Sequence, residues 1–229
     1  MTGPRASLAA VTAACVGLAG SLAAQGAGVA PARRVSAAAH TAFSRATSVA
    51  LAYESSFPVL AGGRVRLGYL VRGTAFGVAS GAAFGNVSPE LFGTPQADSL
   101  RPADGMVLAA LNAAVTAQVA LAPRLELGVS LDIAGVTVGG GEAVASDVSP
   151  AGLRRAEPVG TNLFRGGRAD RGSLNSEFAI TWWAGRRTAL RAGWSHAVVE
   201  LTPGAVLRGS SDRYRLQLDR PFAGVVIGL

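Results

Sequence analysis

One short segment, Gly193-Trp194-Ser195-His196-Ala197, carries the residue types of a nucleophile and a general base. It departs from the G-x-S-x-G motif of serine hydrolases, because position 197 is alanine. Neighbouring side chains in an extended strand point to opposite faces, so Ser195 and His196 cannot form a hydrogen-bonded nucleophile–base pair without a bulge. We therefore expect no catalytic residues and no enzymatic activity.

The composition removes several other chemistries. All 21 basic residues are arginine, which excludes the phosphate-binding lysine of P-loop proteins and lysine Schiff bases. Two histidines and one cysteine are too few for a structural zinc site, and one cysteine cannot form an intrachain disulfide. We expect no metal and no cofactor.

Charge is the next source of binding chemistry. The formal net charge is +7, but the arginines are scattered rather than gathered on one basic face, so we expect no nucleic-acid binding. Five arginines do cluster within residues 140–173, where guanidinium groups could contact lipopolysaccharide phosphates in a bidentate manner. The alternative is a solvated loop. The five are Arg154, Arg155, Arg165, Arg168 and Arg171.

The elements that must position these residues are strands, because period-two alternation dominates the sequence. In residues 125–139, Val129 shares one face with other apolar residues, and Ser130 shares the other with polar or small ones. Runs of about ten residues exceed the usual soluble strand and match a tilted membrane-spanning strand. Only 15% of the residues are charged, against about 25% in a typical soluble domain.

Eight such strands are predicted, with a bulge at Arg220–Pro221 in the last one. Short turns near 72–73, 122–124 and 184–187 alternate with longer connections at 56–63, 87–106, 140–173 and 201–212. This alternation is typical of outer-membrane barrels, which have short periplasmic turns and long extracellular loops. The predicted strands cover residues 45–55, 64–72, 74–86, 107–122, 125–139, 174–183, 188–200 and 213–229.

The N-terminus has the features of a secretory signal peptide over residues 1–26. Arg5 supplies a positive charge, an alanine-rich apolar stretch follows, and small residues precede a cleavage site near Gly26. We expect residues 27–44 to form an N-terminal periplasmic tail and residues 45–229 to form the barrel. The protein is then exported to the bacterial outer membrane.

The closing segment adds a further feature, since Ala223, Val225, Ile227 and Leu229 alternate up to the last residue. With the leader and the strands, the sequence resembles the small bacterial outer-membrane β-barrels of the OmpA/OmpX type. The resemblance implies an all-β, eight-stranded antiparallel up-and-down transmembrane β-barrel surrounded by outer-membrane lipid. It also implies recognition of the C-terminal strand by the barrel-assembly machinery. Such barrels usually end in an aromatic residue, whereas this chain ends in Leu229.

If the apolar face meets lipid, the opposite face fills the lumen. A barrel of about eight strands is just wide enough for side chains, so charges there must pair. We expect a lumen plugged by ion pairs and a structural or interaction role through the extracellular loops. The alternatives are transport of small solutes or lipid through the barrel, and a soluble secreted ligand-binding barrel. The expected network is Glu54, Arg64, Arg66, Glu126, Asp132, Glu177, Arg191, Arg215 and Asp219.

Overall fold

The chain forms a single antiparallel sheet in a computed structural model that describes residues 32–60, 63–87, 99–145, 153–203 and 212–229. The expected signal peptide lies outside these described residues. The strands are β1 (Arg33–Thr41), β2 (Ala46–Leu60), β3 (Val65–Val78), β4 (Phe84–Asn86), β5 (Ser99–Pro102), β6 (Met106–Ala122), β7 (Leu125–Ala145), β8 (Leu153–Pro158), β9 (Thr161–Leu163), β10 (Leu174–Trp183), β11 (Thr188–Thr202) and β12 (Tyr214–Gly228), with one short 3-10 helix, η3 (Gly167–Ala169).

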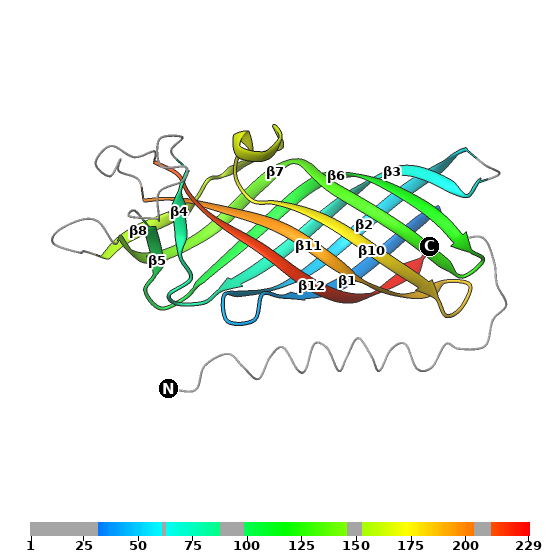
Figure 1. The fold of residues 1–229 in the computed structure, drawn as a ribbon, viewed down its shortest axis with the longest axis horizontal. Coiled ribbons are helices and arrows are strands. Elements are labelled where there is room, and N and C mark those ends of the chain that lie inside the picture. Colours follow the sequence, from blue (N-terminus) through cyan, green and yellow to red (C-terminus); the bar gives the residue numbers. More distant parts are fainter. Residues whose placement is uncertain (1–31, 61–62, 88–98, 146–152, 204–211) are drawn as a thin grey trace.

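Eight of these strands form a closed ring, in the order β1, β2, β3, β6, β7, β10, β11, β12 (Figure 1). The ring closes because β12 also pairs with β1, with Arg34 opposite Gly228 and His40 opposite Phe222. All of these pairings are antiparallel, so the predicted all-β antiparallel class is confirmed. A closed ring satisfies the backbone hydrogen bonds of every wall strand and leaves no open edge.

Two predicted strand boundaries are wrong. Residues 33–41, expected in an N-terminal tail, form β1; their outward side chains include Ala37 and Ala39, which are too small to give a strong hydrophobic alternation. Residues 65–78, predicted as two strands with a turn at 72–73, form the single strand β3. Gly73 pairs there with Leu51 on one side and Leu111 on the other. Gly73 is therefore an interior residue of β3 and not part of a turn.

The predicted bulge in the last strand is also absent. β12 pairs with β11 without a register shift, through Arg220 opposite Ser195 and Pro221 opposite Trp194. Because the phase does not slip, Arg220 points into the ring and is fully buried, while Asp219 points outward and is exposed.

The two ends of the ring differ in their connections (Figure 1). One end, here called the turn end, carries the end of β2, the start of β3, residues 123–124 and 184–187, the start of β1 and the end of β12. The other, here called the loop end, carries the longer connections that contain β4, β5, β8 and β9, and a short turn at 42–45. Most of the segment 56–63, predicted to be a long connection, is strand instead, because β2 continues to Leu60 at the turn end.

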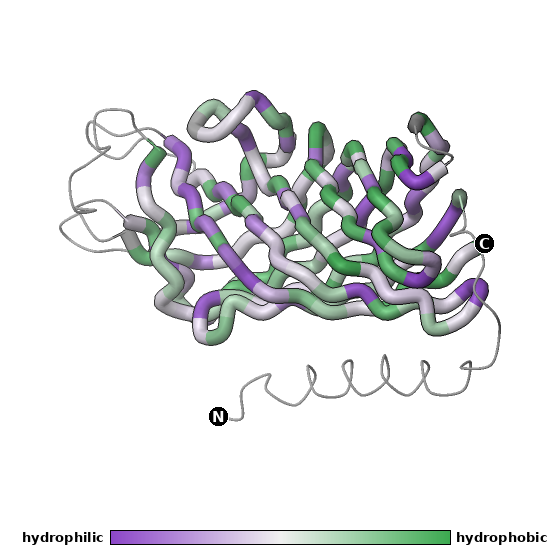
Figure 2. The backbone as a smooth tube through the Cα atoms, turned by 45° about the vertical axis from the view of Figure 1, so that its right-hand side comes forward, coloured by the Kyte–Doolittle hydropathy of each residue, from purple (hydrophilic) through white to green (hydrophobic). Residues whose placement is uncertain are grey.

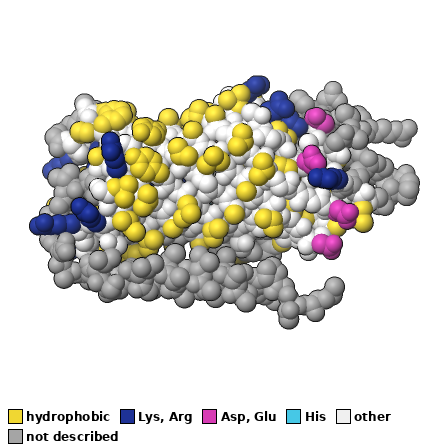
Figure 3. All heavy atoms as spheres, turned by 180° about the vertical axis from the view of Figure 1, so that it is seen from behind, with side chains coloured by type: hydrophobic (Ala, Val, Ile, Leu, Met, Phe, Trp, Pro, Cys, Tyr) yellow, Lys and Arg dark blue, Asp and Glu magenta, His cyan; other side chains and the backbone are white. Residues whose placement is uncertain are grey.

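The ring strands separate apolar from polar side chains. Hydropathy alternates in short steps along them (Figure 2), and the large apolar residues Leu51, Tyr69, Val115, Val129 and Ile180 are exposed on the outside. On the face shown in Figure 3, apolar side chains cover the middle of the wall and charged ones lie toward its two ends. The described part of the chain contains no helix with the length and hydropathy of a membrane span.

Candidate functional site

The interior of the ring consists of three layers along its axis. Near the turn end, Trp183, Ala189 and Val226 form a small apolar cluster. Near the loop end, a larger apolar core includes Phe84 and Leu100 from the short strands β4 and β5. Between the two apolar layers lies a layer of charged and amide side chains, which is the candidate functional site.

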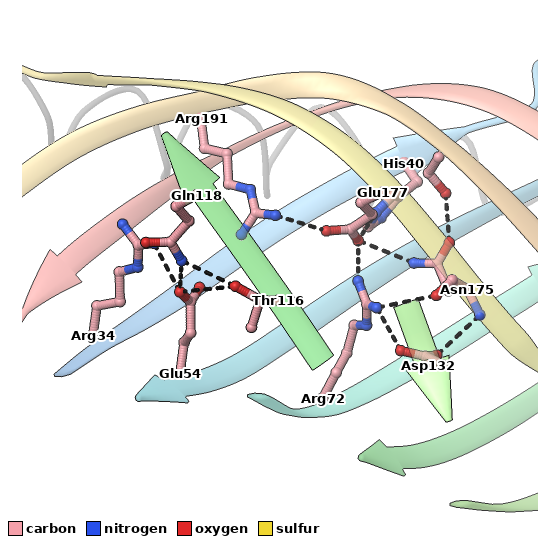
Figure 4. Close-up of polar contacts among 11 residues, drawn as sticks. Arg34, His40, Glu54, Arg72, Thr116, Gln118, Asp132, Asn175, Glu177 and Arg191 are labelled. Carbon is pink, nitrogen blue, oxygen red and sulfur yellow. Dashed lines mark hydrogen bonds and ion pairs between the residues drawn. The ribbon is translucent and has the colours of Figure 1, made fainter. Parts of the chain in front are cut away.

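The first part of this charged layer is centred on Arg34 of β1. Its Nη2 atom donates to Glu54 Oε1 at 2.7 Å and its Nη1 atom donates to Glu126 Oε2 at 2.9 Å. Glu54 also accepts hydrogen bonds from Gln118 and Thr116 of β6 (Figure 4). One guanidinium group thus joins β1 to β2 and, across the interior, to β7.

The second part is centred on Arg72 of β3, a residue with 2% side-chain exposure. Its guanidinium contacts Asp132 Oδ1 at 2.5 Å and also pairs with Glu177 of β10 (Figure 4). Glu177 in addition contacts His40 Nε2 at 3.2 Å and accepts a hydrogen bond from Arg191 Nη2 at 3.1 Å. Three cationic or imidazole groups from β1, β3 and β11 therefore share one carboxylate.

Amide groups complete the coordination of Asp132. Its Oδ2 atom accepts a hydrogen bond from Asn112 Nδ2 at 2.7 Å and another from the backbone N–H of Asn175 at 2.9 Å. The Asn175 side chain accepts from Ser195 Oγ at 2.8 Å. Buried carboxylates need this degree of hydrogen bonding, because an unsatisfied charge in a low-dielectric interior is strongly destabilising.

Arg220 is the exception within this layer. It is fully buried, its Nε atom donates to Ser195 Oγ at 3.4 Å, and its guanidinium lies 5.2 Å from the centre of the Phe76 ring. Among the described residues, its two terminal nitrogens have no hydrogen-bond partner. A cation–π contact therefore takes the place of the carboxylate contacts that Arg34, Arg72 and Arg191 make.

The structure brings together six of the nine residues expected in the lumen. Arg64 is exposed and lies just before β3 at the turn end. Arg215 and Asp219 lie on the outer face of β12, opposite Glu200 and His196, because the bulge that would have turned them inward does not exist. The six buried or largely buried in the interior are Glu54, Arg66, Glu126, Asp132, Glu177 and Arg191.

Four central residues of the network were missed by the sequence analysis. Arg34 and His40 were placed in a tail, Arg72 was placed at a turn, and Arg220 was placed at a bulge. The alternation of Arg34, Ser36, Ala38 and His40 with Val35, Ala37 and Ala39 was a signal that could have revealed β1. Cross-strand partners for Arg72 could not be read without the register.

The geometry of the charged layer fits a plug. Two hollows reach into it, one beside Arg34 and one beside Arg72, and each has a volume of about 10 Å³. A hollow of this size holds about one water molecule. The layer therefore ties opposite walls of the ring together and leaves little space among the described side chains.

The arginines expected to contact phosphates lie at the loop end. Arg165 and Arg171 line a hollow of about 430 Å³ together with Arg213 and Asp212. Arg155 instead pairs with Glu157 on β8, at 2.9 Å. The side chains of Arg154 and Arg168 lie outside the described part of the structure.

Comparison with known proteins gives distant structural likenesses only. No family model matches the chain, and no curated protein matches its sequence with significance. The crystal structure of Neisserial surface protein A is 9% identical, with 86% of this chain and 96% of that chain covered and a TM-score of 0.40. The structure of the NanC porin in a rhombohedral crystal form is 12% identical, with 86% of this chain and 100% of that chain covered and a TM-score of 0.25.

Proposed function

We propose that this chain is a bacterial outer-membrane protein whose ring of eight strands crosses the bilayer as an up-and-down β-barrel. Its role is structural and interactive, exerted through the connections at the loop end. The observation that carries the proposal is the polarity of the ring: apolar side chains cover the outside, and ion pairs fill the middle of the inside.

A soluble barrel would have the reverse polarity. Val129 and Leu51 point out of the ring and are exposed, whereas Arg72 and Asp132 point inward and are almost fully buried. Water would favour the opposite arrangement, because exposed apolar area and buried charge are both unfavourable in an aqueous setting. Lipid around the wall removes the first cost, and the closed ring of backbone hydrogen bonds meets the requirement of a membrane-spanning sheet.

The closed interior supports a structural role over transport. The purified barrel in a planar bilayer is expected to show no large, stable conductance, because the network of Arg34 and Arg72 spans the interior. A reproducible ion-selective open state would contradict the plug and favour transport of small solutes.

The loop-end hollow is the proposed contact for lipopolysaccharide. Arg165, Arg171 and Arg213 line it, and guanidinium groups bind phosphate oxygens in a bidentate manner. The lipid headgroups of the outer leaflet would lie at this end if the turn end faces the periplasm. In the same orientation, β12 would present its alternating outer residues, such as Val225 and Ile227, to the barrel-assembly machinery.

The test is envelope fractionation combined with gel electrophoresis of heated and unheated samples. The full chain should sediment with outer membranes, and the unheated protein should migrate differently from the heated one, because a closed barrel resists detergent unfolding. Recovery of most of the protein in the soluble periplasmic fraction would contradict the membrane assignment.

A further inference from the structure

A serine, a histidine and an aspartate face each other across three neighbouring strands on the outside of the ring. Ser176 of β10 is directly opposite His196 of β11, and His196 is directly opposite Asp219 of β12. His196 Nδ1 lies 2.8 Å from Asp219 Oδ1. The strand register thus assembles a row of these three side chains, although they are far apart in the sequence.

This row of polar side chains lies on the outer wall, where a charged group that faces lipid lowers the stability of a barrel. The next cross-strand pair toward the turn end is Phe178 opposite Trp194, and both are exposed. An ionisable side chain on the lipid face of a barrel is destabilising, by about 2–4 kcal/mol for arginine or lysine at the midplane and less for acidic residues. Ionisable residues kept at membrane depth mark functional sites by default.

On the loop-end side of this row, residues 170–172 cover the outer wall. Glu200, on the outer face of β11, accepts a hydrogen bond from the backbone N–H of Gly172, and Arg215 donates to the carbonyl oxygen of Asp170. The next outward pair toward the loop end, Leu174 opposite Val198, is consequently buried. The Ser176–His196–Asp219 row is therefore the accessible polar strip between a covered region and an apolar wall.

The spatial order is that of a serine-hydrolase triad. A carboxylate at Nδ1 fixes the tautomer and orientation of the imidazole and leaves Nε2 as the base. Ser176 is on the opposite side of His196 from Asp219, and among the described residues its hydroxyl has no hydrogen-bond partner, so it is free to turn toward the imidazole. Nucleophile–base contacts are often looser without substrate than in the reacting complex.

We propose that Ser176, His196 and Asp219 form an acyl-hydrolase site on the outer wall, which cleaves carboxylic esters of membrane lipids. The Phe178–Trp194 pair beside the site supplies apolar surface for an acyl chain. Ser195, the serine next to His196 in the sequence, has no part in it, because it is fully buried inside the ring.

The reaction is a two-step acyl transfer. The Ser176 Oγ atom attacks the ester carbonyl carbon while its proton moves to His196 Nε2. The C–O bond to the alcohol then breaks, and the alcohol leaves with that proton, so that an acyl-Ser176 ester remains. Water next attacks the acyl carbon with the same imidazole as base, which releases the fatty acid and restores the serine hydroxyl. Asp219 acts as a positioning residue.

The direct test uses the full chain, folded in detergent micelles, and an alkyl fluorophosphonate as the probe. The probe should form a Ser176 Oγ–P bond with loss of fluoride, and peptide mass spectrometry should place the adduct on Ser176. Ser176→Ala should abolish this adduct. Ser55→Ala is the matched control, because Ser55 lies on the outer face of β2, away from the row, and the labelling of Ser176 should be unchanged.

His196→Gln should slow the labelling of Ser176 by at least about tenfold, because a general base is worth about 10²- to 10⁴-fold in rate. Asp219→Asn should also slow it, and Asp219→Glu should restore part of the rate. The readout that separates positioning from folding is the ¹⁵N NMR signature of the imidazole, in which Asp219→Asn should shift the protonated nitrogen away from Nδ1.

Two results would overturn the proposal: no adduct on Ser176 in protein that is heat-modifiable on a gel, or an adduct that forms equally fast in His196→Gln. The lipid substrate class rests on the proposed membrane location, but the probe is soluble. A chain that fractionates as soluble and still labels at Ser176 would refute the location alone, whereas a membrane-embedded chain that does not label would refute the hydrolase site alone.

Discussion

Arg34 of β1 and Glu54 of β2 face each other in register, and their side chains form an ion pair of 2.7 Å inside the ring. The same guanidinium reaches Glu126 of β7 at 2.9 Å. The first strand is therefore part of the interior network as well as of the wall, and the segment that precedes β2 is required for the fold.

Removal of this cation should be strongly destabilising. Arg34→Met leaves Glu54 and Glu126 buried without their shared cation, and breaking a buried pair in this way costs about 3–5 kcal/mol. Arg33→Met is the control, because Arg33 is adjacent in sequence but exposed. The free energy of unfolding, measured by urea titration in lipid vesicles, should fall for Arg34→Met only. Equal, small effects of both variants would mean that the segment is a tail.

Arg72 and Arg220 provide a comparison between two buried arginines. Arg72→Met leaves Asp132 and Glu177 without their central cation and should cost about 3–5 kcal/mol. Arg220→Met removes a guanidinium that has a ring contact to Phe76 and one long hydrogen bond, so it should cost about 2 kcal/mol, the size of a desolvated cation–π contact, and less than Arg72→Met. The same urea titration compares them, and equal losses would show that Arg220 is held by charge after all.

The fold class was predictable because the apolar face of a barrel strand repeats every second residue, as in residues 125–139. Strands with small outward residues gave no such signal, and β1 was missed for this reason. A break between two strands was predicted at 72–73 because glycine usually weakens a strand. In the structure the strand continues through Gly73, where an added Cβ atom would meet no other atom within 4 Å.

The side chains that line the interior could be predicted only for strands in which the inward-facing positions were assigned correctly. Glu54, Glu126, Asp132 and Glu177 lie inside as parity requires. A supposed bulge at 220–221 reversed the phase of β12 and placed Asp219 with them. The pairing of His196 with Asp219 depends on register between strands, which no single-strand pattern contains.

Two strand glycines on opposite faces of the wall should respond differently to alanine: Gly193 lies on the inner face of β11, and Gly73 lies on the outer face of β3. A Cβ atom at Gly193 would overlap the carbonyl oxygen of Phe178 in the neighbouring strand, whereas a Cβ atom at Gly73 would meet no atom within 4 Å. Gly193→Ala should therefore reduce the free energy of unfolding, and Gly73→Ala should leave it unchanged or raise it by about 0.4–1 kcal/mol. Comparable stability of the two variants would refute the close approach of β10 and β11.

The loop-end hollow should bind phosphorylated lipid through Arg165 and Arg171, which line it. The double variant Arg165→Gln, Arg171→Gln should weaken binding of lipopolysaccharide to the purified barrel, since each removes a bidentate phosphate contact. Arg155→Gln is the control, because Arg155 already pairs with Glu157 and does not line the hollow. Calorimetric titration measures the affinities; equal losses in the control would point to a general charge effect.

The most direct test of the membrane-facing wall uses two adjacent residues of β7. Val129 points outward and is exposed, and Ser130 points inward and is buried. Arginine at a lipid-facing midplane position costs about 2–4 kcal/mol, whereas lipid yields to a larger apolar side chain. Inside a packed interior, added bulk instead costs about 1–3 kcal/mol.

The measurement is the free energy of unfolding of Val129→Phe, Val129→Arg and Ser130→Phe in lipid vesicles. An apolar wall that faces lipid predicts that Val129→Phe is tolerated, while Val129→Arg and Ser130→Phe are each destabilised. If Val129→Phe loses as much stability as Val129→Arg while Ser130→Phe is tolerated, Val129 belongs to a packed core and the wall does not face lipid.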